Sequence, residues 1–256
     1  MNPDVATKLR VYWRPGCSSC VKVKEFLNQQ GVEFESIDVS ARPEAMQDLL
    51  AFGVKTVPVV ARGGEFVFAQ ALEDVSRFIG RKFSADRLAP ELLIEKWLRV
   101  LRAAQRHARQ IPADRLHERA TGGRDRSIGT LAYHVYQIPD AFLQAIENGE
   151  QNLAAVYDTP LPKDVTGVEH IAAYGDKITR KLDAWWNALP DKSCRQKVKT
   201  YYGERPLHEL LERCTWHSAQ HARQIIAVLE RLGVEPDGRL TAADYSGLPM
   251  PQGLWE

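Results

Sequence analysis

The pattern of hydrophobic and polar positions changes after about residue 80. Before that point, short apolar runs alternate with amphipathic stretches in the order β-α-β-α-β-β-α. From residue 90 onward, apolar residues recur at helical spacing in four longer segments, at about 93–108, 127–138, 168–189 and 206–232. We therefore predict two domains, a small α/β domain followed by an all-α, up-down four-helix bundle.

A short polar connection that ends in a proline separates the two predicted domains. We place the α/β domain at residues 1–82, the linker at 83–89 and the bundle domain at 90–256. The last stretch, 236–256, is rich in glycine and proline, so we expect it to wrap the bundle as ordered coil.

Composition narrows the classes of function. The 34 basic and 33 acidic residues give a net charge of +1 without a basic stripe, which argues against nucleic-acid binding. The apolar runs are too short to span a bilayer, and we expect neither a membrane segment nor a signal peptide. Of the four cysteines, two form a C-x-x-C pair and two are far apart, a usage that suits the reducing cytoplasm.

The C-x-x-C pair, Cys17 and Cys20, follows a predicted strand and a Pro-Gly turn, so Cys17 opens a helix. Backbone N–H groups and the helix dipole at that end favour a thiolate. Arg14 adds positive charge nearby, and Cys20, one turn later, can resolve a mixed disulfide. A zinc half-site and two inert thiols are alternatives, but one C-x-x-C in a βαβ context is typical of redox chemistry. We predict Cys17 and Cys20 as catalytic residues.

The same region, about residues 7–81, resembles the glutaredoxins through this strand–Cys–helix arrangement and the segment Thr56-Val57-Pro58. The resemblance implies a thioredoxin-like fold in which Pro58 is cis and faces the cysteine pair. It also implies that Cys17 is the nucleophile and that glutathione, or a similar low-molecular-weight thiol, is the cosubstrate. The residues implied to bind this thiol are Arg14, which would neutralise a glutathione carboxylate, and Thr56, Val57 and Pro58.

One segment departs from the glutaredoxin pattern. Members usually carry a Gly-Gly pair followed by acidic residues before the last helix, where the γ-glutamyl end of glutathione is held. Residues 69–74 here read Ala-Gln-Ala-Leu-Glu-Asp, without a glycine pair. A redox partner domain or protein is therefore an alternative to glutathione, whereas the dithiol chemistry is unaffected.

Three histidines fall on the apolar faces of predicted bundle helices. His217 and His221 are one turn apart in the last helix, and His134 has a comparable position in the second. A buried imidazole without a partner costs about 1–3 kcal/mol, so its presence needs a reason. Satisfied core histidines are the alternative, but three imidazoles pointing inward from two helices would form an open metal site. We predict His134, His217 and His221 as metal ligands.

Two further residues decide whether the metal site has more than three protein ligands. Cys214, close to His217 on the same stripe, is either a fourth ligand or a small buried thiol, and we favour the thiol. His107 lies near the apolar stripe of the first helix, where packing is the favoured role over joining the site. A fourth protein ligand would close the site, whereas three leave a position for chemistry. The remaining histidines are expected in loops or on the surface: His117, His170 and His208.

Residues 88–256 resemble the DinB/YfiT-like superfamily. The matching stretches are 126–134 and 217–225, which contain the three histidines, and the tail stretches 236–240 and 247–251. Members are four-helix bundles that bind a divalent metal through three histidines. The resemblance therefore implies zinc, with nickel as the alternative, at His134, His217 and His221. Several members are thiol S-transferases or isomerases that use a low-molecular-weight thiol.

The two parts together suggest a cytoplasmic, metal-dependent thiol transferase or reductase of the glutathione type. A bound metal lowers the pKa of a thiol and holds the thiolate for attack on an electrophile, and the dithiol would reduce the resulting mixed disulfide or oxidised product. The expected partners are a small-molecule thiol and an electrophile or disulfide, without nucleic acid or membrane, and a homodimer is a weaker expectation. The alternatives are a non-catalytic metal, electrophile or redox sensor and a metal-dependent hydrolase. The hydrolase ranks last, since no glutamate stands between His217 and His221.

Overall fold

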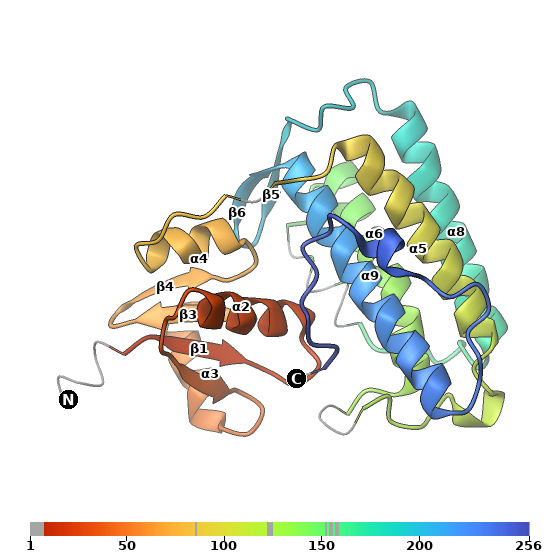
Figure 1. The fold of residues 1–256 in the computed structure, drawn as a ribbon, viewed down its shortest axis with the longest axis horizontal. Coiled ribbons are helices and arrows are strands. Elements are labelled where there is room, and N and C mark those ends of the chain that lie inside the picture. Colours follow the sequence, from red (N-terminus) through yellow and green to blue (C-terminus); the bar gives the residue numbers. More distant parts are fainter. Residues whose placement is uncertain are drawn as a thin grey trace. The chain divides into compact units, whose positions relative to one another are not determined.

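The chain forms two compact units (Figure 1). The computed structural model describes residues 8–84, 86–121, 125–151, 153, 156 and 159–255. The first unit comprises Met1–Asp86 and Pro251–Glu256, and the second comprises Arg87–Met250. This division differs from the predicted one chiefly at the end of the chain.

The last residues of the chain belong to the first unit. The expectation that the whole stretch 236–256 wraps the bundle is therefore wrong for this end of the chain. The carboxylate of Glu25, on α2 (Ser18–Gln29), accepts the backbone N–H groups of Gln252 and Gly253 at 2.8 and 2.7 Å. These charge-assisted hydrogen bonds hold the tail on α2. The tail is also not coil throughout, because α10 (Ala242–Tyr245) forms one helical turn that begins with a capping box.

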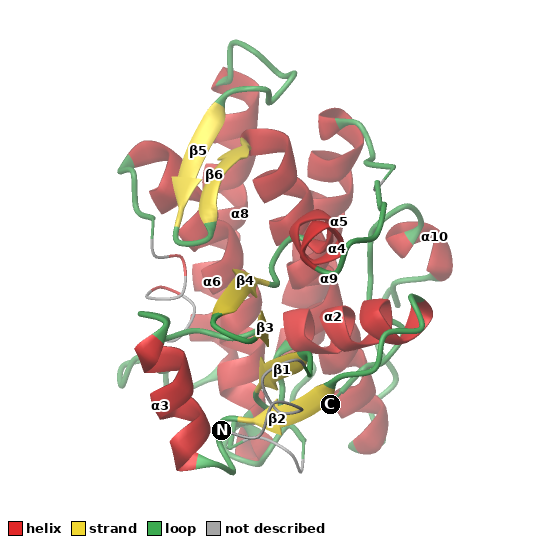
Figure 2. Ribbon diagram, turned by 90° about the vertical axis from the view of Figure 1, so that its left-hand side faces the viewer, coloured by secondary structure: helices red, strands yellow, loops and turns green. Residues whose placement is uncertain are grey.

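The first unit contains a four-stranded mixed sheet with the strand order β2-β1-β3-β4 (Figure 2). β1 pairs parallel with β2 and antiparallel with β3, which in turn pairs antiparallel with β4. This confirms the predicted order of elements. The strands are β1 (Arg10–Trp13), β2 (Glu35–Asp38), β3 (Val59–Arg62) and β4 (Glu65–Phe68), and the helices after α2 are α3 (Pro43–Ala51) and α4 (Leu72–Phe78).

Alternating side chains along the strands divide the core of this unit into two layers. On one face of the sheet, Val11 belongs to a buried cluster with Phe26 of α2 and Val75 of α4. On the other face, Tyr12 belongs to a cluster with Leu49 of α3. Since successive strand residues point to opposite faces, both faces of β1 are covered by helices. The turn that carries the C-x-x-C pair is therefore anchored at both ends, by β1 and by α2.

The second unit is a four-helix bundle, as predicted. Its helices are α5 (Pro90–Arg109), α6 (Ile128–Glu147), α8 (Val168–Ala188) and α9 (Leu207–Arg231). Ser127 caps α6 by accepting the N–H of Thr130 at 3.1 Å. Gly233, whose φ of 74° suits glycine, follows α9. Among the described residues, no helix combines the length and apolar composition that a membrane crossing requires.

The order of the bundle helices differs from the simple up-down arrangement that we predicted. Neighbouring helices α5 and α9 run in the same direction. His208 bonds the Leu88 carbonyl near both helix starts, at 2.8 Å, and His107 bonds the Asp237 carbonyl near both ends, at 3.1 Å. Helices α6 and α8 also run together, since Glu147 and the last turn of α8 line one surface pocket. The connection between them, 148–167, is long enough to return along the bundle, so consecutive helices need not be antiparallel.

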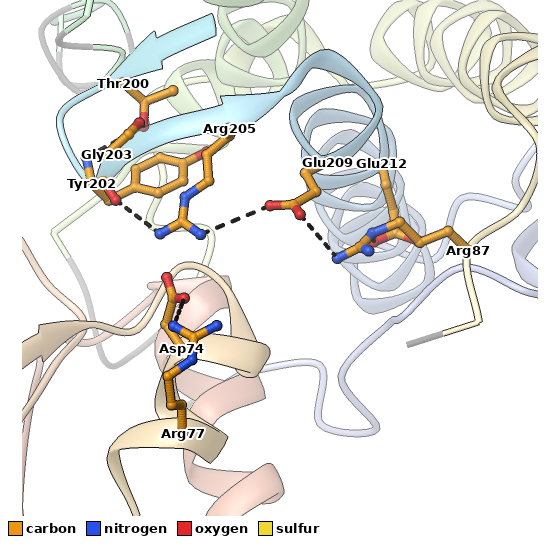
Figure 3. A network of polar contacts seen from close by, with 9 residues as sticks. All are labelled: Asp74, Arg77, Arg87, Thr200, Tyr202, Gly203, Arg205, Glu209 and Glu212. Carbon is orange, nitrogen blue, oxygen red and sulfur yellow. Dashed lines mark hydrogen bonds and ion pairs between the residues drawn. The ribbon is translucent and has the colours of Figure 1, made fainter. Parts of the chain in front are cut away.

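A β-hairpin between α8 and α9 is absent from the predicted elements. It consists of β5 (Lys197–Thr200) and β6 (Gly203–Pro206) and contacts α6 and α9 (Figure 2). An ion-pair network ties it to the start of α9 (Figure 3). Arg205 of β6 pairs with Glu209 at 4.0 Å, and Arg87 pairs with Glu209 and Glu212 at 3.8 and 3.2 Å.

A Gly175→Ala variant tests the close approach of α6 and α8. A Cβ atom at Gly175 would lie 2.6 Å from the ring of Tyr136, which is fully buried and cannot swing aside. The overpacking costs about 1–3 kcal/mol, more than the helix propensity of alanine returns at about 1 kcal/mol. We expect a lower free energy of unfolding in urea. In a Tyr136→Leu background, which removes the ring, the same change should be neutral or stabilising; an equal loss in both backgrounds would contradict the packing account.

Candidate metal centre and dithiol site

Helices α6 and α9 bring the three predicted histidines together. One ring nitrogen each of His134, His217 and His221 lies within 4.8 Å of the others. The Nε2 atoms of His217 and His221 are 3.1 Å apart, and the ring centroid of His134 lies 5.7 and 4.7 Å from theirs. Nitrogen ligands of a tetrahedral zinc ion are about 3.3 Å apart, for bonds of about 2.0–2.1 Å. The geometry therefore fits three ligands of one ion.

The protonation state of these imidazoles also suits a metal. All three side chains are buried, with exposed fractions of 4, 8 and 1%. Burial lowers the pKa of His134 and His217 well below the ordinary value; Arg126 adds to the effect at His134, and His221 and Arg213 add to it at His217. A neutral imidazole offers the lone pair that a metal ion needs. Imidazole nitrogens of this kind are the donors expected of an open zinc or nickel site.

Two glutamines outside the predicted site contact the outer ring nitrogens. Nδ1 of His134 lies 3.2 Å from Oε1 of Gln137, and Nδ1 of His221 lies 2.6 Å from Oε1 of Gln224. Each glutamine follows its histidine by three residues and so shares its helix face. The repeated His-x-x-Gln spacing is the sequence signal that they share, but it does not by itself identify their contacts.

The other candidate ligands lie outside this group. Among the described residues, the group contains neither Cys214 nor His107. Cys214 is buried, and Nε2 of His107 bonds the carbonyl of Asp237 at 3.1 Å. The donor atoms that converge in this group are therefore the nitrogens of three histidines. Of the remaining histidines, His117 and His170 are exposed as expected, whereas His208 is half-buried.

The first unit presents the cysteine pair at the start of α2. Cys17 is the N-cap of this helix, and its Sγ accepts the N–H of Cys20 at 3.2 Å. The two cysteines form a disulfide, in which Cys17 is half-buried and Cys20 is fully buried. Exchange requires access to a sulfur, and of this pair only Cys17 is not fully buried. The arrangement suits Cys17 as the nucleophile and Cys20 as the resolving residue.

The strand register places Pro58 at the same edge of the sheet as the cysteine turn. In the antiparallel pairing of β1 and β3, Tyr12 faces Val59. Trp13 and Pro58 are the next residues of the two strands toward that edge. The C-x-x-C turn begins directly after Trp13, so the two segments of the predicted thiol site lie together.

The remaining residues of the predicted thiol site belong to these segments. The peptide bond between Val57 and Pro58 is cis, as the resemblance implies. Thr56 and Arg14 are half-buried. Gln70, from the stretch that lacks the glycine pair, donates its side-chain N–H to the carbonyl of Val57 at 3.5 Å. The departure from the family pattern thus lies against the backbone that is predicted to pair with the thiol.

Two family models match the chain. The model described as Glutaredoxin matches residues 9–67, and the model described as DinB superfamily matches residues 96–225. The first match contains the cysteine pair and Pro58, and the second contains all three histidines.

Curated relatives and solved structures add three comparisons. N-acetyl-S-hydroxy-L-cysteine reductase of Bacillus subtilis (strain 168) is 43% identical over 60 residues, which cover 22% of this chain and 63% of that protein, less than two thirds of its length. Glutaredoxin-like protein NrdH of Escherichia coli (strain K12) is 36% identical over 56 residues, covering 22% and 69%. The structure of YfiT from Bacillus subtilis, described as a probable metal-dependent hydrolase with an unusual four-helix bundle topology, is 15% identical, covers 60% of this chain and 93% of that one, and has a TM-score of 0.46.

Proposed function

The chain belongs to the DinB superfamily and carries a glutaredoxin domain ahead of it, and on this premise we propose that it is a metal-dependent low-molecular-weight thiol transferase with its own dithiol reductase. The observation that carries the proposal is the convergence of three buried imidazole nitrogens within 4.8 Å, in a chain that also holds a C-x-x-C pair. The occurrence of both sites in a single chain supports a shared reaction.

In the bundle, His134, His217 and His221 would hold a divalent ion, zinc first and nickel as the alternative. When bound, such an ion lowers the pKa of a thiol and keeps the thiolate reactive. The protein supplies three neutral donors, which leave one coordination position for the thiol sulfur. The three rings are buried, so a thiol bound at that position would lie in surroundings of low polarity.

In the glutaredoxin domain, the reduced Cys17 thiolate would attack a mixed disulfide R–S–S–R′. Its sulfur bonds to one sulfur of the disulfide, and the other leaves as a thiolate that takes up a proton. The thiolate of Cys20 then attacks Cys17, releases the second thiol and closes the Cys17–Cys20 disulfide. The two electrons gained by the substrate are those lost by the cysteine pair, and external thiol restores the dithiol.

The substrate class that we propose rests on the name of one relative and on the residues around Cys17. The Bacillus reductase is named for an S-hydroxylated derivative of N-acetylcysteine. We take glutathione or a related cysteine-containing thiol as the cosubstrate here, with Arg14 neutralising its carboxylate and the backbone of Val57 pairing with its peptide. Thr56 and Pro58 complete this surface next to Cys17.

A thiol-dependence assay on zinc-loaded protein tests the proposal. Glutathione, N-acetylcysteine and 2-mercaptoethanol would each be offered with a soluble electrophile, and loss of the free thiol would be followed. We expect turnover that needs both zinc and thiol, and that stops when zinc is removed by a chelator. Zinc-dependent cleavage of esters or amides without thiol would instead support a hydrolase. Stoichiometric zinc binding without any turnover would support a sensor.

A further inference from the structure

The three histidines of the candidate metal centre share a sequence environment. Each is followed at the third position by a glutamine: Gln137 after His134, Gln220 after His217 and Gln224 after His221. All three glutamines are buried, with exposed fractions of 3, 0 and 2%. Two of them contact Nδ1 of their own histidine, whereas Oε1 of Gln220 accepts a hydrogen bond from Arg223 at 3.1 Å. The same spacing therefore brings a glutamine against its own histidine in two cases and against an arginine in the third.

The amide orientation at Gln137 follows from its second partner. Its Nε2 donates to the carbonyl of Thr159 at 3.0 Å, which leaves Oε1 to face Nδ1 of His134 at 3.2 Å. An amide oxygen can only accept, so Nδ1 of His134 must carry the proton. The lone pair of this imidazole is then on Nε2, the nitrogen available to a metal ion.

The contact at His221 has the same consequence. Nδ1 lies 2.6 Å from Oε1 of Gln224, and Nε2 lies 3.1 Å from Nε2 of His217. The proton on Nδ1 again leaves the lone pair on Nε2, on the side of the neighbouring imidazole. Both contacts thus select the tautomer and fix the ring rotation that direct the lone pairs toward one point.

The charge of these acceptors also matters. Metal-bound histidines often donate to a carboxylate, which adds negative charge next to the ion. Here both acceptors are neutral carboxamides. Burial is the main cause that lowers the pKa of His134 and His217, and positive charge adds to it, from Arg126 at His134 and from Arg213 and Arg126 at His217. These arginines are themselves buried, with exposed fractions of 9 and 7%. A divalent ion with three neutral ligands keeps its full charge, and the fourth position then favours an anion.

We propose that Gln137 and Gln224 are positioning residues that hold the Nε2 atoms of His134 and His221 toward the metal and, being uncharged, make the open position selective for an anionic ligand such as a thiolate. The inference rests on the proposed metal site and specifies which ligand that site takes.

Cobalt(II) binding by the full chain, read from its visible absorption, tests the positioning role. Gln137→Met and Gln224→Met remove the acceptor at nearly constant volume, and each should weaken cobalt binding about 10- to 100-fold. Gln220→Met is the matched control, because this glutamine is equally buried and equally spaced but bonds Arg223. It should change the affinity little. Equal effects of all three variants, or none in the first two, would overturn the positioning role.

Glutamate variants test the role of charge. Gln137→Glu and Gln224→Glu restore the acceptor, so cobalt binding should return to the wild-type level or above. The added negative charge should weaken binding of 2-mercaptoethanol thiolate, read from its charge-transfer band to cobalt, by about tenfold or more. Binding of neutral imidazole should not weaken. Unchanged thiolate affinity would overturn the selectivity, whereas a wild-type protein that binds no cobalt would refute the metal site itself.

Discussion

A His217→Ala variant is expected to lose stoichiometric zinc binding while disulfide exchange continues at the wild-type rate. His217 supplies one of three converging nitrogens, and its removal leaves two. Structural zinc sites bind with about 10–16 kcal/mol shared among roughly four ligands, so losing one donor should weaken binding by about a hundredfold to a thousandfold. Zinc per chain after dialysis against a weak chelator measures the loss. Reduction of a mixed disulfide by the same sample measures the retained activity.

His107→Ala is the matched control for this variant. His107 is fully buried like the site histidines, but it bonds the carbonyl of Asp237 and lies outside the converging group. Its loss should lower the free energy of unfolding and leave zinc content unchanged. If His217→Ala retains zinc as the wild type does, or if both variants lose it equally, the three-histidine centre is wrong.

A Cys17→Ser variant should have the opposite profile, with no detectable disulfide reduction and full zinc content. A serine hydroxyl is not ionised at neutral pH and cannot form the mixed disulfide, so the first exchange step is lost. The measurement is reduction of the mixed disulfide between glutathione and 2-mercaptoethanol, together with zinc per chain.

Two further variants separate the roles of the cysteines. Cys20→Ser should accumulate a mixed disulfide on Cys17, visible as an added thiol mass. Cys194→Ser should behave as wild type, because burial raises the pKa of the Cys194 thiol to about 11 and removes it from exchange. Activity that survives in Cys17→Ser, or is lost in Cys194→Ser, would contradict the assigned nucleophile.

Much of the fold is predictable because hydrophobic periodicity follows burial directly. The apolar stripes of α5, α6, α8 and α9 predict four helices, and the short runs of the first unit predict the order of its strands and helices along the chain. The arrangement of the helices is not predictable in this way, since a stripe shows which face is buried but not which helix covers it. The hairpin of β5 and β6 escapes notice because its four-residue strands carry charges and have no apolar run.

The candidate site likewise has a part that the sequence predicts and a part that it does not. Two histidines one turn apart and a third on another apolar face predict the convergence, because an imidazole in such a stripe needs a partner. Gln137 and Gln224 are not apparent, since a glutamine at that spacing also occurs on ordinary helix surfaces. The folded structure distinguishes Gln224, which contacts His221, from Gln220, which contacts Arg223.

X-ray absorption at the zinc edge of the loaded, reduced full-length protein tests the central claim most directly. With His134, His217 and His221 as ligands, the first shell should contain nitrogen or oxygen at about 2.0–2.1 Å and no sulfur. Adding 2-mercaptoethanol should then introduce one sulfur at about 2.3 Å. A first shell with two sulfurs before any thiol is added would place the zinc on Cys17 and Cys20 instead, and would contradict the account.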